Sequence, residues 1–141
     1  MAQLAWQGVP HRLRPAVWLE AVGGQRRKKA AAAGGAKSYA DYLGEAAAAL
    51  TAQAKEIALD IPRTFGQRHV RFSPSAAAAG AHASLLPALE RVVSAVVAAN
   101  SRRGYWQGMN FLCGFLLLCL PSEEDAFWVA LCIIDDVIPC L

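Results

Sequence analysis

The segment from Ser84 to Asn100 constrains the fold more than any other part of the sequence. Its apolar residues recur at three- and four-residue steps and cover a wide helical face: Leu85, Leu86, Leu89, Val92, Val93, Val96 and Val97. A helix with so wide an apolar face is mostly buried. Ser84 is a candidate N-cap, and the run from Asn100 to Gly104 supplies cations in the last turn and a glycine beyond it.

A second long helix is predicted over residues 38–60. Its apolar stripe is formed by Leu43, Ala47, Leu50, Ala54, Ile57 and Ile61. Pro62 is expected to end this helix, because proline disfavours helical geometry at the residue before it. Arg63 would then leave the helix and reach outward.

Two further helical elements follow. Residues 105–120 form a third long element, and Ser122 begins a new helix with three acidic residues in its first turn. The apolar residues of this last helix are Phe127, Trp128, Leu131 and Ile134.

The N-terminal part is less regular. Pro15 fits the first turn of a short helix whose buried face would contain Val17 and Trp18. Residues 23–37 have glycine pairs near both ends and predict a flexible loop, and residues 73–82 predict a loop or a weak helix start. The basic block at residues 26–29 is either a solvated part of that loop or a contact for anionic lipid or an acidic partner.

The pattern contains no useful strand alternation, so we expect an all-α fold in one domain over residues 1–141. Hydrophobic residues make up 55% of the chain and charged residues 18%, which excludes disorder. A net charge of +3 without a basic face argues against nucleic acid as a partner.

The sequence shows neither a membrane-spanning segment nor a secretory signal. The apolar run over residues 111–120 is about half the roughly 20 residues that a membrane-spanning helix needs. No secretory signal follows Met1, so we expect a cytoplasmic protein. The four cysteines, Cys113, Cys119, Cys132 and Cys140, are interpreted as small buried hydrophobes in a reducing compartment.

Familiar catalytic signatures are missing from the sequence. It contains no G-x-S-x-G, no H-E-x-x-H and no phosphate-binding G-x-x-x-x-G-K-[ST] motif. The three histidines, His11, His69 and His82, are scattered and lie far from the cysteines, so no metal site is predicted.

Two short polar islands interrupt the apolar pattern. One is Asp60-x-x-Arg63-Thr64, and the other runs from Tyr105 through Gln107 to Asn110. Polar residues between apolar helices are costly unless they are hydrogen-bonded. A structural interpretation pairs Asp60 with Arg63 and bonds the amides to backbone. A functional one directs Arg63 and Gln107 toward a partner.

The islands resemble motifs of the TBC domain, the GTPase-activating domain that acts on Rab GTPases. Residues 57–64 are similar to its I-x-x-D-x-x-R motif, and residues 105–110 to its Y-x-Q-G-M-N motif. Residues 8–18, which include Arg14 and Trp18, resemble its opening element, and residues 122–128 its next helix. The motifs at residues 8–18, 57–64 and 105–110 occur in the family's order, and the resemblance covers essentially the whole chain.

The resemblance implies an irregular multi-helix TBC-type fold, with the N-terminal subdomain and the start of the C-terminal one. The family domain is longer, so truncation at the C-terminal end is expected. Arg63 would be an arginine finger, and Gln107 a glutamine finger that orients the attacking water. Asp60 would hold the guanidinium.

Supporting roles are implied for Thr64, Tyr105 and Asn110 as well. Trp18 and Arg14 would anchor the opening helix, or Arg14 would help position the site. The partner would be a Rab GTPase in its GTP form that carries the GTP and Mg²⁺, and the chain itself would need no cofactor. Peripheral association with endomembranes stays open.

Two departures from the family pattern affect the same islands. Gly66 stands where the family usually has proline, and Trp106 replaces a smaller residue. A TBC-like scaffold that binds a small GTPase or adaptor without accelerating hydrolysis is therefore an alternative, and a purely structural helical fragment is a third.

Overall fold

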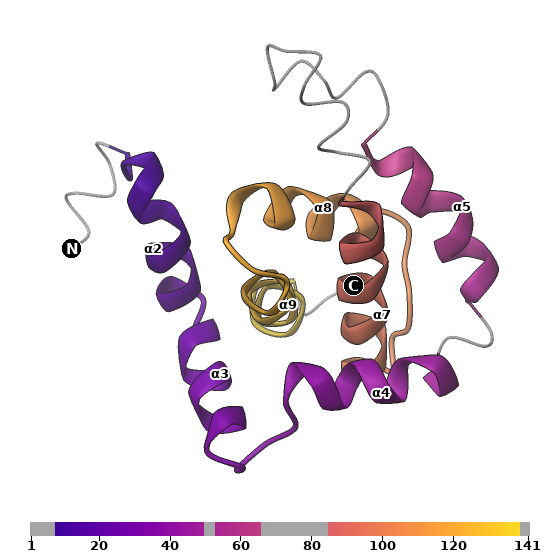
Figure 1. The fold of residues 1–141 in the computed structure, drawn as a ribbon, viewed down its shortest axis with the longest axis horizontal. Helices are drawn as coiled ribbons and strands as arrows, with labels where there is room; N and C mark the ends of the chain where they lie inside the picture. Colours follow the sequence, from indigo (N-terminus) through magenta and orange to yellow (C-terminus); the bar gives the residue numbers. More distant parts are fainter. Residues whose placement is uncertain (1–7, 50–52, 66–84, 139–141) are drawn as a thin grey trace.

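The computed structural model describes residues 8–49, 53–65 and 85–138. Within these ranges every regular element is helical, which confirms the all-α prediction (Figure 1). The elements are η1 (His11–Leu13), α2 (Arg14–Ala21), α3 (Gly24–Ala32), α4 (Tyr39–Ala49), α5 (Ala54–Thr64), α7 (Leu86–Ala99), α8 (Met109–Cys119), α9 (Glu123–Cys132) and η3 (Ile133–Val137). The predictions for Leu50, Gly66, residues 73–82, Ser84 and Cys140 lie outside the described residues.

The core is built around α7 and α9. Figure 1 looks along α9 at the centre of the molecule, with α2 and α3 on one side and α7 on the other. All residues of α9 from Ala126 to Cys132 are buried, and so are the valines of α7. The prediction of a mostly buried helix is thus confirmed for α7. This helix ends at Ala99, so Arg102 and Arg103 follow it rather than lie in its last turn.

The beginning of α9 is as predicted. The Ser122 hydroxyl accepts a hydrogen bond from the Asp125 backbone N–H at 3.1 Å, and three acidic residues occupy the first turn. Carboxylates at this end interact favourably with the helix dipole. The chain continues directly into η3, a π-helical turn in which the Ile138 N–H donates to the Ile133 carbonyl. Ile134 is buried as expected, although it lies in η3.

The prediction of one helix over residues 38–60 is wrong, because the segment contains the two helices α4 and α5. The expected stripe is divided between them: Leu43 is half-buried on α4, while Ile57 and Ile61 are buried on α5. Ala54 is exposed at the start of α5. Alanine favours a helix at any position, so an alanine-rich pattern does not show where one helix stops.

Pro62 does not end α5, which continues to Thr64. Proline inside a helix costs about 3 kcal/mol, because it removes one hydrogen bond and its ring crowds the preceding turn. Burial of Ile61 and Thr64 offsets this cost, since these side chains are 7% and 4% exposed. Arg63 therefore projects from the last turn of a helix rather than from a chain that has left it.

The predicted loop at residues 23–37 is largely helical. Gly23 adopts a left-handed φ of 79° and separates α2 from α3, and α3 then contains the whole basic block. Arginine, lysine and alanine are strong helix formers, so the glycine pair marks a junction rather than a flexible loop.

The opening helix and the later elements differ in detail from the prediction. In α2 the buried residue is Leu19, Trp18 is half-buried, and Val17 is 37% exposed, so Val17 was wrongly assigned to the buried face. The predicted element at residues 105–120 is helical only from Met109, because the turn up to Gly108 precedes α8.

Candidate functional site

The two predicted finger residues lie at neighbouring helix ends. Arg63 is in the last turn of α5, and Gln107 is in the turn that leads into α8. Figure 1 shows this end of α5 beside the start of α8. Both side chains are exposed, and neither forms a hydrogen bond or ion pair with another residue in the described part of the chain.

A set of four polar residues joins these helix ends. We call it the polar knot: Asp60 and Thr64 from α5, Tyr105 before α8, and Asn110 in its first turn. The Tyr105 hydroxyl donates to the Asp60 carboxylate at 2.8 Å, and the Asn110 side-chain amide donates to Thr64 Oγ1 at 2.8 Å. The Asp60 carbonyl accepts from Thr64 Oγ1 at 2.9 Å and from the Asn110 amide at 3.4 Å.

The polar knot changes the expected role of Asp60. Its carboxylate contacts Tyr105, and no ion pair joins Asp60 to Arg63 among the residues that the structure describes. The structural interpretation of an Asp60–Arg63 pair is therefore wrong. The amide of Asn110 does bond to backbone, as that interpretation expected, whereas Gln107 does not within the described residues.

Three of the four residues of the polar knot are buried. Tyr105, Thr64 and Asn110 are 6%, 4% and 1% exposed. Burial and the hydrogen bond to Asp60 raise the pKa of Tyr105, so its hydroxyl stays protonated and donates at neutral pH. A hydrogen bond to a charged group contributes about 1.5–3 kcal/mol. Breaking this bond would therefore weaken the junction of α5 and α8.

Two buried polar atoms near this junction are unpaired among the described residues. They are the Asn110 Oδ1 and the Trp106 indole Nε1. The side-chain NH₂ of Asn110 thus donates within the polar knot, while its Oδ1 has no partner in the described structure. Trp106, the departure noted in the sequence, is half-buried against the core.

Gly114 lets α5 and α8 approach closely. A Cβ atom at this position would lie 2.8 Å from the Thr64 methyl carbon and 3.3 Å from the Phe65 ring. Carbon atoms in ordinary contact are separated by about 3.5–4.0 Å. The packing at the polar knot therefore requires a residue without a side chain here.

Sequence reasoning missed Gln53, which lies immediately before α5. Its Oε1 accepts from the Tyr105 backbone N–H at 2.6 Å, and its Nε2 donates to the Tyr105 carbonyl at 3.4 Å. No motif marks this residue, since the contact spans 52 positions along the chain. A glycine directly before Tyr105 was the signal that a side chain approaches the backbone there.

The remaining predicted residues, Arg14 and Trp18, lie on α2. Trp18 stacks on Phe115 of α8, with ring centroids 6.0 Å apart, and Phe115 is itself 54% exposed, so this contact lies at the surface rather than in the core. Arg14 is exposed, and its Nε donates to the Val9 carbonyl at 2.9 Å. Arg14 thus fixes the turn before α2 rather than the core, and it makes no contact with the polar knot in the described residues.

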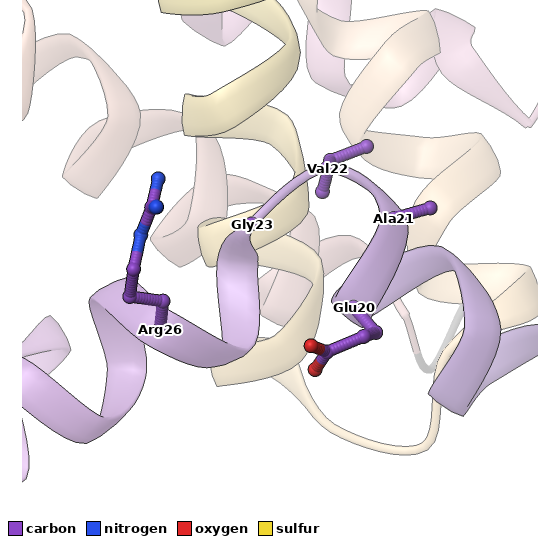
Figure 2. A pocket seen from close by; sticks show the side chains of 5 residues that line it. All are labelled: Glu20, Ala21, Val22, Gly23 and Arg26. Carbon is purple, nitrogen blue, oxygen red and sulfur yellow. The ribbon is translucent and has the colours of Figure 1, made fainter.

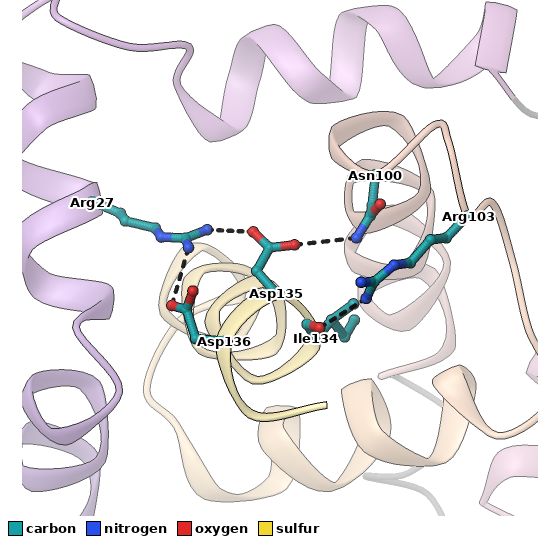
Figure 3. A network of polar contacts seen from close by, with 6 residues as sticks. All are labelled: Arg27, Asn100, Arg103, Ile134, Asp135 and Asp136. Atoms are coloured by element: carbon teal, nitrogen blue, oxygen red, sulfur yellow. Dashed lines mark hydrogen bonds and ion pairs between the residues drawn. The ribbon is translucent and has the colours of Figure 1, made fainter. Parts of the chain in front are cut away.

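The basic block has a structural role at two of its positions. Arg27 bonds Asp135 at 2.6 Å and Asp136 at 3.1 Å, and Lys28 bonds Asp125 at 2.8 Å. Figure 3 shows Asp135 between Arg27 and Asn100, where it also accepts from the Asn100 amide. The block was not a solvated loop, because α3 turns these two cations toward α9 and η3.

Two surface depressions lie away from these helix ends. One, of about 340 Å³, is lined by Glu20, Gly23 and Arg26 at the junction of α2 and α3 (Figure 2). Another, of about 640 Å³, lies between α2, α3 and the start of α9. Neither is lined by a residue of the polar knot, by Arg63 or by Gln107.

Other chemistry finds little support in the described residues. They contain no group of three or more His, Cys, Asp or Glu residues placed to hold a metal ion, and no helix among them is long and apolar enough to cross a membrane. Cys113 and Cys132 are buried as predicted, while Cys119 is half-buried. Burial raises the pKa of the Cys113 thiol to about 12, which makes it a poor nucleophile at neutral pH.

Comparison with known proteins places the fold in a family. Residues 11–138 match the Rab-GTPase-TBC domain. A crystal structure of a Chlamydomonas flagellar RabGAP TBC domain superposes with a TM-score of 0.70 at 32% identity, over 95% of this chain and 42% of that one.

Curated relatives agree with this match. A TBC domain-containing protein from Schizosaccharomyces pombe is 33% identical over 97% of this chain, and human small G protein signaling modulator 3 is 32% identical over 99%. The rat TBC1 domain family member 2A is 33% identical over 99% of the chain. The chain spans 14–17% of the length of these relatives. Its sequence and its fold together show that the chain belongs to the Rab-GTPase-TBC domain family.

Proposed function

We propose that this chain activates GTP hydrolysis by a Rab-family GTPase through Arg63 and Gln107. One observation carries the proposal. Arg63 lies between Asp60 and Thr64 on α5, and Gln107 lies between Tyr105 and Asn110 before α8. Each exposed residue is thus bracketed by two members of one hydrogen-bonded set, three of whose four residues are buried. Such preorganisation of two groups is what transition-state stabilisation requires.

Arg63 would act on the charge that develops during phosphoryl transfer. Negative charge grows on the oxygens of the transferred phosphate and on the leaving oxygen, and a guanidinium placed there stabilises the transition state more than the ground state. Its planar fork can donate to two oxygens at once, which a lysine ammonium cannot reproduce. The exposure of Arg63 in the described structure leaves its fork available to a partner.

Gln107 would position the attacking water. A carboxamide accepts a hydrogen bond through its oxygen and donates through its nitrogen, so it can hold a water while it contacts a phosphate oxygen. Gln107 is exposed two residues after Tyr105, whose backbone and hydroxyl are both held by residues of the α5 region. Its main chain is therefore supported from α5 although its side chain faces solvent.

The other residues have supporting roles in this proposal. The polar knot holds the ends of α5 and α8 together, and Trp18 fastens α2 to α8. GTP and Mg²⁺ would belong to the partner GTPase, and the chain would supply side chains alone. The site would act in the cytoplasm, on GTPases presented at endomembranes.

A panel assay tests the proposal. Single-turnover GTP hydrolysis is measured for a panel of Rab GTPases with the 141-residue chain and with Arg63→Ala, Arg63→Lys and Gln107→Ala. Lys55→Ala is the matched control, because Lys55 is an exposed cation on the same helix. An arginine finger contributes about 10³–10⁵ in rate, so we expect Arg63→Ala to abolish most of the acceleration. Arg63→Lys should recover little of it, and Lys55→Ala should match the original chain.

Binding is measured beside hydrolysis in the same panel. Arg63→Ala should leave the affinity for the GTP-loaded partner within a few-fold. Binding by a folded chain without any acceleration would overturn the proposal and establish the non-catalytic scaffold instead. If the chain neither binds a GTPase nor accelerates hydrolysis, the third alternative, a purely structural helical fragment, is favoured. Far-UV circular dichroism identifies which samples are folded.

A further inference from the structure

Gln53 and Tyr105 form a contact that the proposed roles of Arg63 and Gln107 do not include. We call it the Gln53 clamp: the side-chain amide of Gln53 with the backbone N–H and carbonyl of Tyr105. The shorter bond, from the Tyr105 N–H to Oε1, is 2.6 Å, and the longer, from Nε2 to the Tyr105 carbonyl, is 3.4 Å. One amide side chain thus pairs with both polar groups of a single residue, in the way that a neighbouring strand would.

Gly104 makes the clamp sterically feasible. It has a φ of 66°, and a Cβ atom there would lie 2.5 Å from Nε2 and 2.6 Å from Oε1 of Gln53. A side chain at residue 104 would therefore occupy the place of the Gln53 amide. The residue before Tyr105 is fitted to the clamp in both its backbone conformation and its size.

The clamp and the polar knot hold Tyr105 at two places along α5. Gln53, at the N-cap position of α5, binds the backbone of Tyr105, and Asp60 binds its hydroxyl. The two α5 anchors are seven residues apart, which is about two helical turns. Arg63 is one turn further along the same helix, and Gln107 is two residues beyond Tyr105.

We propose that Gln53 is a positioning residue that sets Gln107 relative to Arg63. The proposal rests on the proposed function of those two residues. With the clamp intact, the turn from Gly104 to Gly108 is fixed to both ends of α5. Without it, the hydroxyl of Tyr105 remains as an anchor, and the backbone that carries Gln107 can shift while the helices stay packed.

The test compares Gln53→Ala, which removes both bonds, with Gln53→Glu, which keeps the acceptor of the shorter bond. Single-turnover hydrolysis is measured over a range of chain concentrations, so that the maximal rate and the half-saturating concentration are separated. A misplacement of 1 Å can cost about 10²-fold in rate. We therefore expect Gln53→Ala to lower the maximal rate at least about 10-fold, with half-saturation changed by less than about 3-fold. Gln53→Glu should restore part of that rate, and Lys55→Ala should change neither value.

Hydrogen exchange at the Tyr105 amide provides a readout independent of hydrolysis. Its N–H should be protected in the original chain and in Gln53→Glu, and should exchange faster in Gln53→Ala. An unchanged maximal rate in a folded Gln53→Ala chain that has lost this protection would overturn the positioning role and leave the proposed function intact. If the original chain accelerates no GTPase, both proposals fall. Should Gln53→Ala not fold, the maximal rate of Gln53→Glu decides. A rate below that of the original chain supports the positioning role. A rate equal to that of the original chain would show that the bond from Nε2 to the Tyr105 carbonyl does not position Gln107.

Discussion

Replacement of Gly114 by alanine should separate the contribution of helix propensity from that of packing. The new Cβ would lie 2.8 Å from the Thr64 methyl carbon, about 0.6 Å short of the 3.4 Å at which ordinary contact begins. Thr64 cannot simply rotate away, because its side chain is β-branched, buried and bonded to both Asp60 and Asn110. The end of α5 must therefore move away from α8.

The change in the free energy of unfolding for Gly114→Ala follows from two opposing effects. Alanine is about 1 kcal/mol more favourable than glycine inside a helix. Overpacking of a tight interface costs about 1–3 kcal/mol. The free energy of unfolding should therefore fall by up to about 2 kcal/mol for Gly114→Ala.

Gly44→Ala is the matched control, because Gly44 lies in α4 and a Cβ there would meet nothing within 4 Å. It should raise the free energy of unfolding by about 1 kcal/mol. Urea denaturation followed by circular dichroism measures both variants. Equal stabilisation by the two substitutions would refute the reasoning, because it would mean that α5 and α8 do not approach as closely as described.

Three further predictions concern individual side chains. Tyr105→Phe removes the 2.8 Å bond to the Asp60 carboxylate and should lower the free energy of unfolding by about 1.5–3 kcal/mol in urea denaturation. No change would show that the bond adds nothing to stability. Cys113, whose pKa is raised to about 12 by burial, should resist a thiol reagent at pH 8 until denaturant is added, as peptide mass spectrometry can check. The hydrogen bond from Arg91 lowers the pKa of Glu123, so this carboxylate stabilises the fold above its unfolded pKa and loses that effect as pH falls through its folded value. Glu123→Gln should therefore lower the free energy of unfolding by at most about 1 kcal/mol at neutral pH, because the pair is partly exposed. This difference from the original chain should vanish in acid, and a difference that stays constant with pH would contradict the reasoning.

The sequence predicted the buried helices well because their patterns are unambiguous. The buried valine face of α7 and the Ser122 cap of α9 can each be predicted from neighbouring residues alone, and both are present in the structure. Failures occurred where tertiary contacts outweigh local rules. Pro62 stays inside α5 because Ile61 and Thr64 are buried, and burial cannot be read from the residues beside a proline.

The candidate site shows the same division. The two motifs pointed to the right helix ends, but the partner of Asp60 was wrongly expected to be Arg63 rather than Tyr105. Proximity along the chain favoured the pair three residues apart, whereas the fold brings together residues 45 positions apart. Gln53 was missed for the same reason, since neither its spacing nor its residue type marks a contact with Tyr105.

The ion pair between Arg27 and Asp135 has a consequence for the order of events during synthesis. The two residues are 108 positions apart, and Lys28 likewise finds its partners at the start of α9. At about 5–20 residues per second, a ribosome needs roughly 5–20 s to deliver those acidic residues after the basic ones have been made. During that delay α3 has no docking surface on α9, and its four consecutive cations keep it hydrated. Helix α3 is thus synthesised early but reaches its final position late.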